Sequence, residues 1–440
     1  MEEAYFDSLA RAADAALAAG EAHTMAFAGE ATDFVRMNRG KVRQPGHVTQ
    51  RSVALRLIRG ARHASHLLTL KGDARVDGQA IGAAVDELRG ALASLPEDPH
   101  LLLPDAVRST RSVRAAPLPP AEAIVDQLLT LATGHDLVGM LATGIVYRGF
   151  ADSRGQRNWH AVDAFNLQWS LYPRADKAVR SSYSGLDWSA EALRSRVAAA
   201  VERLALVSRP AKTIAPGQYR AYLSPAAMQE ITDLLHWGGF SARALETQQS
   251  PLARMRDGAT LDPRVTIVED IAGGVAPAFQ NDGFTRPSRT PLIEGGKLVG
   301  ALVSPRTARE FALATNGANA SESPESLSMA QGELAQDDVL AALDTGLAIG
   351  NLWYLNYSDR PAGRMTGMTR FATFWVEGGK IVAPVDVMRF DDTLFRMLGE
   401  NLEALTRSRE MLLEANTYGE RALASVTLPG ALLRSLSFTL

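Results

Sequence analysis

Two long strand candidates place the tightest limit on the fold of this chain. They run from Leu137 to Phe150 and from Ala161 to Tyr172, and the segment Asp152 to Gln156 between them has the Asp, Ser and Gly content of a turn. Helix candidates lie on either side, at 121–132 and at 191–207. In the second of these, apolar residues recur at spacings of four and three, as on one face of an amphipathic helix. The chain therefore combines extended strands with helices that can cover them.

The first hundred residues predict the same mixture. An Ala-rich helix is expected over 3–19, because Gly20 follows it. Residues 51–58 alternate between apolar and polar, which is the period of a half-buried strand, and 63–70 can pair with them across a short turn. A further helix is expected at about 76–95. This helix–strands–helix order predicts an N-terminal α+β domain in which helices and strands form an α/β, sandwich-like arrangement.

The second half of the chain has a different pattern of predicted elements. It follows the proline-rich stretch 96–120, which is expected to be an extended connector, and the helices at 121–132 and 191–207. Strands then dominate, interrupted by a few helices. Ser224-Pro225 and Ser304-Pro305 are predicted helix starts, because serine can cap a helix and proline suits the first helical position.

Two glycine pairs mark hairpins in this second half. Residues 293–298 and 376–381 each place Gly-Gly between apolar residues, and glycine accepts the positive φ of a tight two-residue turn. The stretch 316–336 is rich in Ser, Glu, Ala and Gly, so a mobile loop is expected there. We predict a C-terminal β-rich domain with a largely antiparallel, barrel-like sheet. The two domains are placed at 1–210 and 211–440.

The size and composition of the chain limit the classes of function that it can have. A chain of 440 residues is too long for one ordinary core, which favours two domains. The net charge of −3 gives no basic field for nucleic acid, and no apolar run nears the roughly 18 residues needed to span a bilayer. The acidic N-terminal residues do not resemble a signal peptide, and cysteine is absent, which fits a reducing compartment. A soluble cytoplasmic protein is therefore expected.

Few residues form a recognisable catalytic pattern. No G-x-S-x-G elbow, phosphate-binding loop or dinucleotide-binding glycine motif is present. His63 and His66 fall on opposite faces of a strand, so they are not expected to share a metal ion. Glu246, Glu269 and Asp270 are interpreted as residues of solvent-exposed turns rather than paired catalytic acids.

Several motifs in the chain resemble, in the right order, those of one protein family. They match its N-terminal strand signature, its entry into a central helix and two hairpins that carry glycine turns. The matching segments, in chain order, are 30–42, 214–219, 223–227, 281–284, 291–298 and 374–385. The family is the TldD/TldE group, which includes PmbA and is also called modulator of DNA gyrase. The resemblance extends over nearly the whole chain.

What the resemblance implies depends on the zinc positions. TldD subunits resemble zinc peptidases, with an HExxxH helix and a C-terminal cysteine as a further ligand. TldE subunits lack these ligands and pair with TldD around a cavity in which unfolded peptides are trimmed. Here His236 matches the first histidine, Trp237 replaces the glutamate and Ser241 replaces the second histidine. Catalytic zinc takes three protein ligands, and tryptophan cannot accept a proton from water, so the chain resembles TldE.

This resemblance implies a non-catalytic subunit of a heteromeric metallopeptidase, which shapes the cavity and holds the peptide. Zinc is expected on the partner subunit and none in this chain. The partner would be a TldD-like homologue, or a second copy of this chain, since aromatic-rich strands leave apolar edges that a dimer would cover. No nucleic-acid or membrane partner is expected. Arg360, Arg364 and Arg370 are candidate substrate-binding residues, because arginine binds peptide carboxylates well.

Two other functions stay open. The chain resembles its family in fold motifs, yet the segment 358–367 departs from the family's small-residue hairpin. It is therefore also interpreted as a repurposed, metal-free protein of specialised metabolism, or as a modulator that binds protein segments without cutting them.

Overall fold

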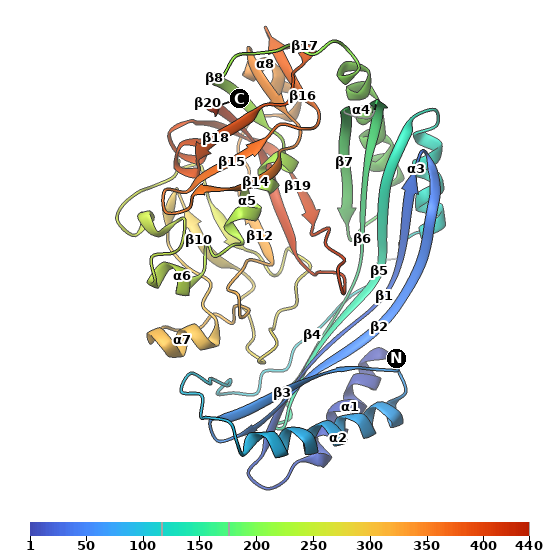
Figure 1. Ribbon diagram of the computed structural model, residues 1–440, viewed down its shortest axis with the longest axis vertical. Coiled ribbons are helices and arrows are strands. Elements are labelled where there is room, and N and C mark those ends of the chain that lie inside the picture. The colour runs from blue at the N-terminus through green and yellow to red at the C-terminus, as the bar shows by residue number, and fades with distance from the viewer. Residues whose placement is uncertain (116–117, 175–176, 440) are drawn as a thin grey trace.

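The computed structural model describes residues 1–115, 118–174 and 177–439 and contains two large sheets (Figure 1). The first is seven-stranded, in the order β3-β2-β1-β5-β6, with both β4 and β7 paired to the outer edge of β6. All its pairs are antiparallel except β4 with β6. Its strands are β1 (Ala22–Asn38), β2 (Lys41–Arg59), β3 (Arg62–Thr69), β4 (Arg111–Arg114), β5 (Asp136–Asp152), β6 (Arg157–Arg174) and β7 (Lys177–Gly185).

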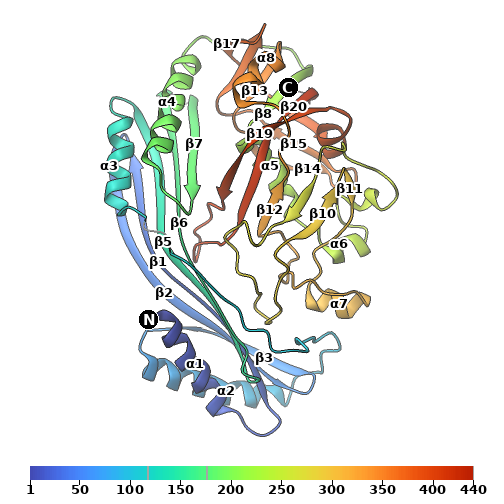
Figure 2. The ribbon, with the colours of Figure 1, turned by 180° about the vertical axis from the view of Figure 1, so that it is seen from behind.

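Helices cover only one face of this first sheet. On β1, Met25 and Phe27 join the core beneath the first helix pair, and Val35 and Met37 join the core beneath the second pair. Because alternate residues of a strand point to opposite faces, the even-numbered residues of β1 face the other way. Figure 2 shows both pairs on the outer side of the curved sheet. The pairs are α1 (Glu2–Ala16) with α2 (Ala74–Leu92), and α3 (Ala121–Leu131) with α4 (Ala190–Val207).

The second sheet lies on the inner side of this curve and is organised around its last strand. β20 pairs with β12 in parallel and with β8, β18 and β19 in antiparallel register. The main strand path runs from β11 to β17 without closing into a barrel among the described residues. The strands are β8 (Gly217–Leu223), β9 (Ile267–Glu269), β10 (Thr290–Glu294), β11 (Lys297–Leu298), β12 (Ser326–Met329), β13 (Gly346–Ile349), β14 (Trp353–Asp359), β15 (Arg364–Met368), β16 (Thr373–Glu377), β17 (Lys380–Pro384), β18 (Arg389–Thr393), β19 (Leu402–Leu413) and β20 (Ser425–Phe438).

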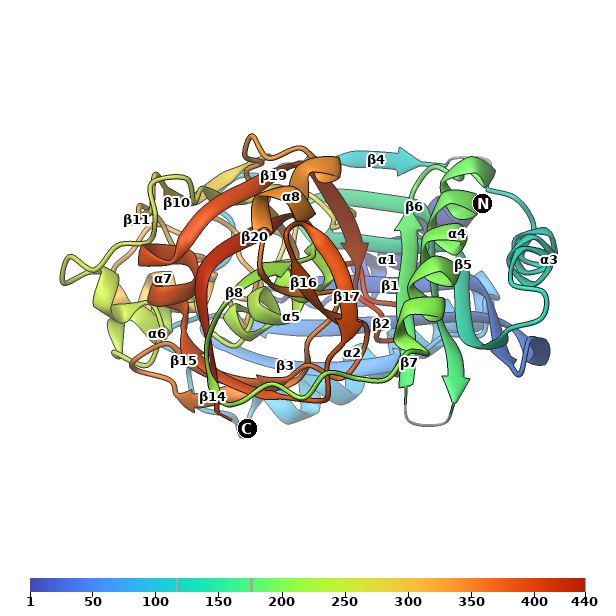
Figure 3. The same cartoon turned by 90° about the horizontal axis from the view of Figure 1, so that it is seen from above.

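Short helices connect the strands of the second sheet. Seen from above, α5 is surrounded by the curved strands of this sheet (Figure 3). The α-helices are α5 (Pro225–Leu235), α6 (Ala242–Glu246), α7 (Pro305–Phe311) and α8 (Val339–Leu343). Single turns of other helix types span Ala253–Met255, Gln336–Asp338 and Arg396–Glu400. In the described part of the chain, none of the helices combines the length and the apolar character that crossing a bilayer requires.

The predicted α+β class and the largely antiparallel second sheet are confirmed. Ser224 and Ser304 cap α5 and α7 through their side chains, as the Ser-Pro pairs predicted. Both glycine pairs form the predicted hairpins, and all four glycines have positive φ. The chain passes from the first sheet to the second between β7 and β8. The division into domains at residue 210 stays a prediction.

Two sequence expectations were wrong. The predicted mobile loop 316–336 contains β12, whose four residues are all buried between β9 and β20. Its polar residues do not form an exposed loop: Ser328 is buried in a strand, where its hydroxyl accepts a hydrogen bond from Arg409. The expected extended connector 96–120 contains the short strand β4, which is itself extended. Glu269 is not in an exposed turn but ends the buried strand β9.

Gly144 of β5 allows the central strands to approach closely. Its φ is +132°, and a Cβ atom there would lie 2.3 Å from the carbonyl oxygen of Ala31 on β1. We predict that Gly144→Ala lowers the free energy of unfolding by about 2–3 kcal/mol, because the backbone oxygen cannot move aside. Gly82→Ala in α2 is the control, since a Cβ there meets nothing within 4 Å and should stabilise the helix by about 0.5–1 kcal/mol. Urea unfolding curves measure both, and equal effects would contradict the prediction.

Buried Glu269 makes stability depend on pH. Burial raises its pKa to about 7, and although Oε1 accepts from the backbone amides of Glu325 and Ser326, Oε2 has no partner among the described residues. A carboxyl with a raised folded pKa contributes stability at low pH and loses it as pH rises through that pKa. We predict that Glu269→Gln is more stable than the wild type at about pH 8, with a smaller difference at about pH 5.

Thermal unfolding across this pH range measures the effect. Glu310→Gln on the exposed side of α7 is the control and should leave the pH dependence unchanged. A wild type and a Glu269→Gln variant with parallel pH profiles would contradict the prediction.

Candidate functional site

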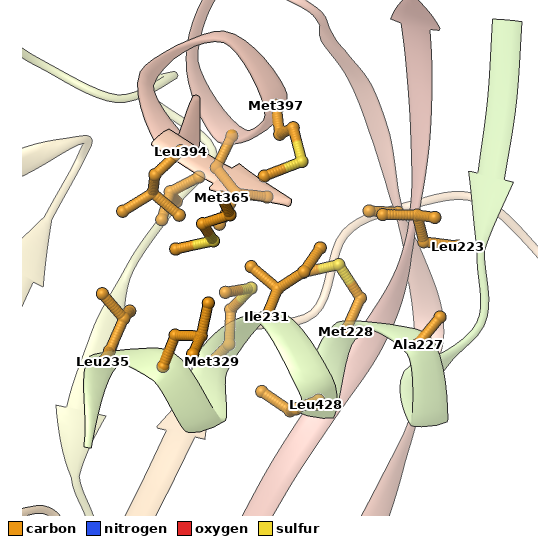
Figure 4. Packing of buried hydrophobic residues seen from close by; sticks show 14 of the residues in the cluster. Leu223, Ala227, Met228, Ile231, Leu235, Met329, Met365, Leu394, Met397 and Leu428 are labelled. Carbon is orange, nitrogen blue, oxygen red and sulfur yellow. The ribbon is translucent and has the colours of Figure 1, made fainter. Parts of the chain in front are cut away.

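One face of helix α5 packs into the hydrophobic core of the second half of the chain. Ala227, Met228, Ile231 and Leu235 are buried, and Figure 4 shows them against Leu223, Met329, Met365, Leu394, Met397 and Leu428 from the surrounding strands and turns. These apolar residues follow the spacing of a helix face, so burial fixes the rotation of α5. Residues on its other side are therefore held in fixed positions.

The helix stops at Leu235, before the positions predicted to be remnants of a metal site. His236 is the C-cap, and the amide of Gly239 donates to the carbonyl of Leu235 at 2.8 Å. Gly238 has a φ of +84°, and a Cβ at Gly239 would lie 2.7 Å from that carbonyl oxygen. These two glycines turn the chain away from the helix axis.

The turn separates the three predicted positions. The Nδ1 of His236 donates to the carbonyl of Thr232 at 3.1 Å, and Trp237 is 52% exposed. Ser241 is buried at the start of α6, where its hydroxyl donates to Glu322 at 2.6 Å and accepts from the amide of Ala244. His236 and Ser241 therefore lie on different helices.

These residues do not fit a zinc ion. Of the three positions, His236 alone is a metal-ligating side chain, and the hydroxyl of Ser241 is already engaged. Nowhere in the described residues do three or more His, Cys, Asp or Glu side chains gather as metal ligands. That these positions are remnants of a metal site stays a prediction.

An acidic wall borders α5 on its open side. It consists of Glu230 and Asp233, one helical turn apart, and Glu414 at the end of β19. Burial, together with the charges of Glu414 and Glu230, raises the pKa of Asp233 to about 7. The Asp233 side chain is nevertheless 45% exposed, so it lies at the surface of α5 rather than in the packed core. Burial also lowers the pKa of neighbouring His236, which favours the neutral imidazole.

The concave face of the first sheet lies opposite the acidic wall. Three adjoining hollows follow it. All three are lined by Met140 of β5, and neighbouring hollows also share Gln168, Thr417, or Arg36 and Gln44. They form one continuous depression, which we call the inter-sheet groove. Arg180 of β7 links its floor to the acidic wall, with Nη1 at 3.9 Å from the Glu230 carboxylate.

The loop between β19 and β20 crosses the groove and is anchored to its floor. Arg421 of this loop is buried and donates to the carbonyls of Gly144 and Ala164, both at 2.9 Å. The side-chain amide of Asn166 donates to the carbonyls of Leu413 and Glu414, both at 3.2 Å. These bonds hold Glu414 beside α5.

The three arginines predicted to bind substrate do not form one cluster. Arg360 donates to the carbonyl of Trp237 and lies over the ring of Tyr357 at 5.7 Å. Arg364 pairs with Asp391 at 2.9 Å. Arg370 instead lies 4.2 Å from the ring centroid of Trp353. Arg360 is thus the one of the three beside His236 and Trp237, and the substrate-binding role of all three stays a prediction.

Sequence reasoning missed most residues of the groove. Asp233 and Glu414 are 181 positions apart in the numbering, and Arg36, Gln168 and Arg180 come from three different strands. One signal was present: alternation along β5 and β6 leaves even-numbered residues on the face that the helices do not cover. The pairing of the strands was needed to bring these residues together.

The second half of the chain matches a known family profile. Residues 216–440 match the profile described as the PmbA/TldA metallopeptidase C-terminal domain, and this is more than half of the chain. The chain belongs to the PmbA/TldD family. The resemblance found in the sequence motifs is thereby confirmed. No curated protein gave a match.

Solved structures share the fold over the whole chain. A candidate modulator of DNA gyrase from Thermotoga maritima is 15% identical, with a TM-score of 0.78 and full coverage of both chains. TldE from Thermococcus kodakarensis is 13% identical, with a TM-score of 0.77, and the match covers 99% of this chain and 100% of that one. A candidate modulator of DNA gyrase from Bacteroides thetaiotaomicron is 17% identical, with a TM-score of 0.73 and 98% coverage of each. At such identities the likeness concerns the fold alone.

The coupling between Glu414 and Asp233 can be tested directly. We predict that Glu414→Gln lowers the pKa of Asp233 from about 7, because it removes the repulsion between two carboxylates. Glu420→Gln in the same loop is the control, since Glu420 is half-exposed and pairs with Arg148. Carbon-13 NMR of aspartate-labelled protein, assigned with Asp233→Asn, follows this carboxyl. An Asp233 pKa that stays unchanged in Glu414→Gln would contradict the assignment.

Proposed function

We propose that this chain is a metal-free, substrate-holding subunit of a TldD/TldE-type metallopeptidase, and that a zinc-bearing homologue supplies the catalytic metal. The observation that carries the proposal is the interruption of α5 at Leu235. It leaves His236 on one helix and Ser241 on the next, with Trp237 between them. Zinc hydrolysis needs several ligands around an open water position and a nearby base.

The inter-sheet groove is the proposed peptide site. It is long and open, as an extended peptide requires, and its walls offer both charged groups and side-chain amides such as Gln44 and Gln168. The whole-chain likeness to the Thermococcus protein called TldE supports this class of subunit. The proposed assembly is a heterodimer with a TldD-like homologue, or a homodimer, and it acts on unfolded peptides. The absence of cysteine fits a cytoplasmic setting.

A second candidate is favoured by Asp233. A carboxyl whose pKa is about 7 can both give and take protons near neutral pH, and the side chain of Asp233 is 45% exposed and so accessible. The chain would then be a repurposed, metal-free enzyme of specialised metabolism. The two candidates differ in what they require: the subunit needs a partner's zinc, whereas the repurposed enzyme needs Asp233.

Co-expression with an HExxxH-bearing homologue tests the leading proposal. We predict that the chain alone holds no stoichiometric zinc in elemental analysis and does not cleave unstructured peptides. With the homologue it should co-purify and support cleavage that a chelator abolishes. His236→Ala in this chain should change the rate little, because the reaction runs on the partner's metal. Chelator-sensitive cleavage by the chain alone, abolished by His236→Ala, would overturn the proposal.

Asp233→Asn separates the two candidates. If the chain is a substrate-holding subunit, the variant keeps kcat in the mixed assembly and alters KM at most, because uniform binding energy is lost. A loss of kcat with unchanged KM would favour the repurposed enzyme.

A further inference from the structure

We propose that the largest hollow of the inter-sheet groove is a subsite for a carboxylate of the bound peptide, supplied by an acidic side chain or by the C-terminus. We call it the basic hollow, and it is defined by Arg36, Arg43 and Arg180. The inference rests on the proposed role of the groove in holding peptides, and it adds a preference for one class of peptide.

The lining of the basic hollow is strongly one-sided in charge. The described residues that line it include three arginines and no aspartate or glutamate. Arg36 and Arg43 form no ion pair within the part of the chain that the structure describes. The chain has more acidic than basic residues, with a net charge of −3, yet none of the carboxylates that the structure describes pairs with these two arginines. Unpaired arginines that gather in one hollow therefore point to an anionic ligand.

A β-bulge brings two of these arginines together. Arg36 of β1 pairs with Gln44 of β2, but the next residue of β1, Met37, pairs with Val42, which leaves Arg43 as an extra residue. In a regular strand, Arg43 and Gln44 would point to opposite faces. The bulge changes the direction of one of these side chains, so both Arg43 and Gln44 line the basic hollow.

Arg180 completes the basic hollow from the other edge of the sheet. Its guanidinium carbon lies 5.7 Å from the ring centroid of Phe371, and its Nη1 is 3.9 Å from Glu230. This separation is too long for a hydrogen bond, so the N–H groups stay available. A guanidinium held by an aromatic ring binds a carboxylate through two parallel bonds at a low entropic cost.

The neighbouring acidic wall limits where a carboxylate can bind. Glu230 lies beside Arg180, and Asp233 and Glu414 lie further along the same wall. A peptide carboxylate is attracted by the basic hollow and repelled by this wall, so it can occupy one position but not the next. The pair of surfaces would thus set the register of an extended peptide in the inter-sheet groove.

Four matched fluorescent peptides test the subsite. They share one unstructured sequence, carry either one Glu or one Gln at its centre, and end in a free or an amidated C-terminus. We predict from fluorescence anisotropy that peptides with a carboxylate bind the chain about tenfold more tightly than the amidated Gln peptide, the gain of one good charge-assisted contact. Added salt should reduce the difference. Comparing the free and the amidated Gln peptides measures the contribution of the C-terminal carboxylate. Comparing the amidated Glu and the amidated Gln peptides measures the contribution of the side-chain carboxylate.

Charge-reversal variants locate the contact. Arg36→Glu and Arg43→Glu should each remove the preference for carboxylates, and the milder Arg36→Gln should reduce it. Arg75→Glu is the matched control, because Arg75 is equally exposed but lies on α2, on the outer side of the first sheet. Circular dichroism checks that each variant is folded. The proposal is overturned if the four peptides bind equally to the wild type, or if the variants weaken all four peptides alike.

The subsite and the subunit role can fail separately. A carboxylate preference that depends on Arg36, without any cleavage alongside a zinc-bearing homologue, would keep the subsite and reject the subunit role. Cleavage in the mixed assembly that treats Glu and Gln peptides equally would do the reverse.

Discussion

The inter-sheet groove depends on the buried guanidinium of Arg421. It donates to the carbonyls of Gly144 and Ala164, on two neighbouring strands of the first sheet, while its own backbone belongs to the loop between β19 and β20. Burial lowers the pKa of this arginine to about 10, and a buried cation without partners would be strongly destabilising. The loop is therefore held against the first sheet. Glu414, at the start of that loop, is held with it and raises the pKa of Asp233 across the groove.

The parts of the fold that could be predicted from the sequence are those determined by residues adjacent in the chain. A Ser-Pro pair determines a helix start through one capping bond, as at Ser224 and Ser304, and a Gly-Gly pair determines a two-residue turn. The parts that were missed depend on distant pairing. β12 is a strand because β9 and β20 lie on either side of it, and its Ser328 is acceptable in the interior because Arg409 supplies a hydrogen bond.

The candidate site was less predictable than the fold for the same reason. Sequence alignment by motif identified His236, Trp237 and Ser241, but spacing along the chain could not show that α5 ends before them. The arginines proposed from the sequence, such as Arg364, have separate partners, whereas Arg36 and Arg180 line the same hollow from distant strands. The bulge at Arg43 shows the limit most clearly, because one extra residue in one strand changes which face a side chain reaches.

The two sides of α5 differ in how strongly packing constrains their residues. The side of α5 that faces the core needs only apolar residues of suitable size, such as Met228 and Ile231. Protein cores tolerate the exchange of one apolar residue for another of similar size. This is consistent with structures at 13–17% identity sharing the fold. After the helix, Phe240 also belongs to this core, whereas Trp237 and Ser241 do not. Trp237 is exposed, and Ser241 stabilises α6 as its cap. Neither residue belongs to the apolar core, so the packing that fixes α5 does not determine the chemistry of these two positions.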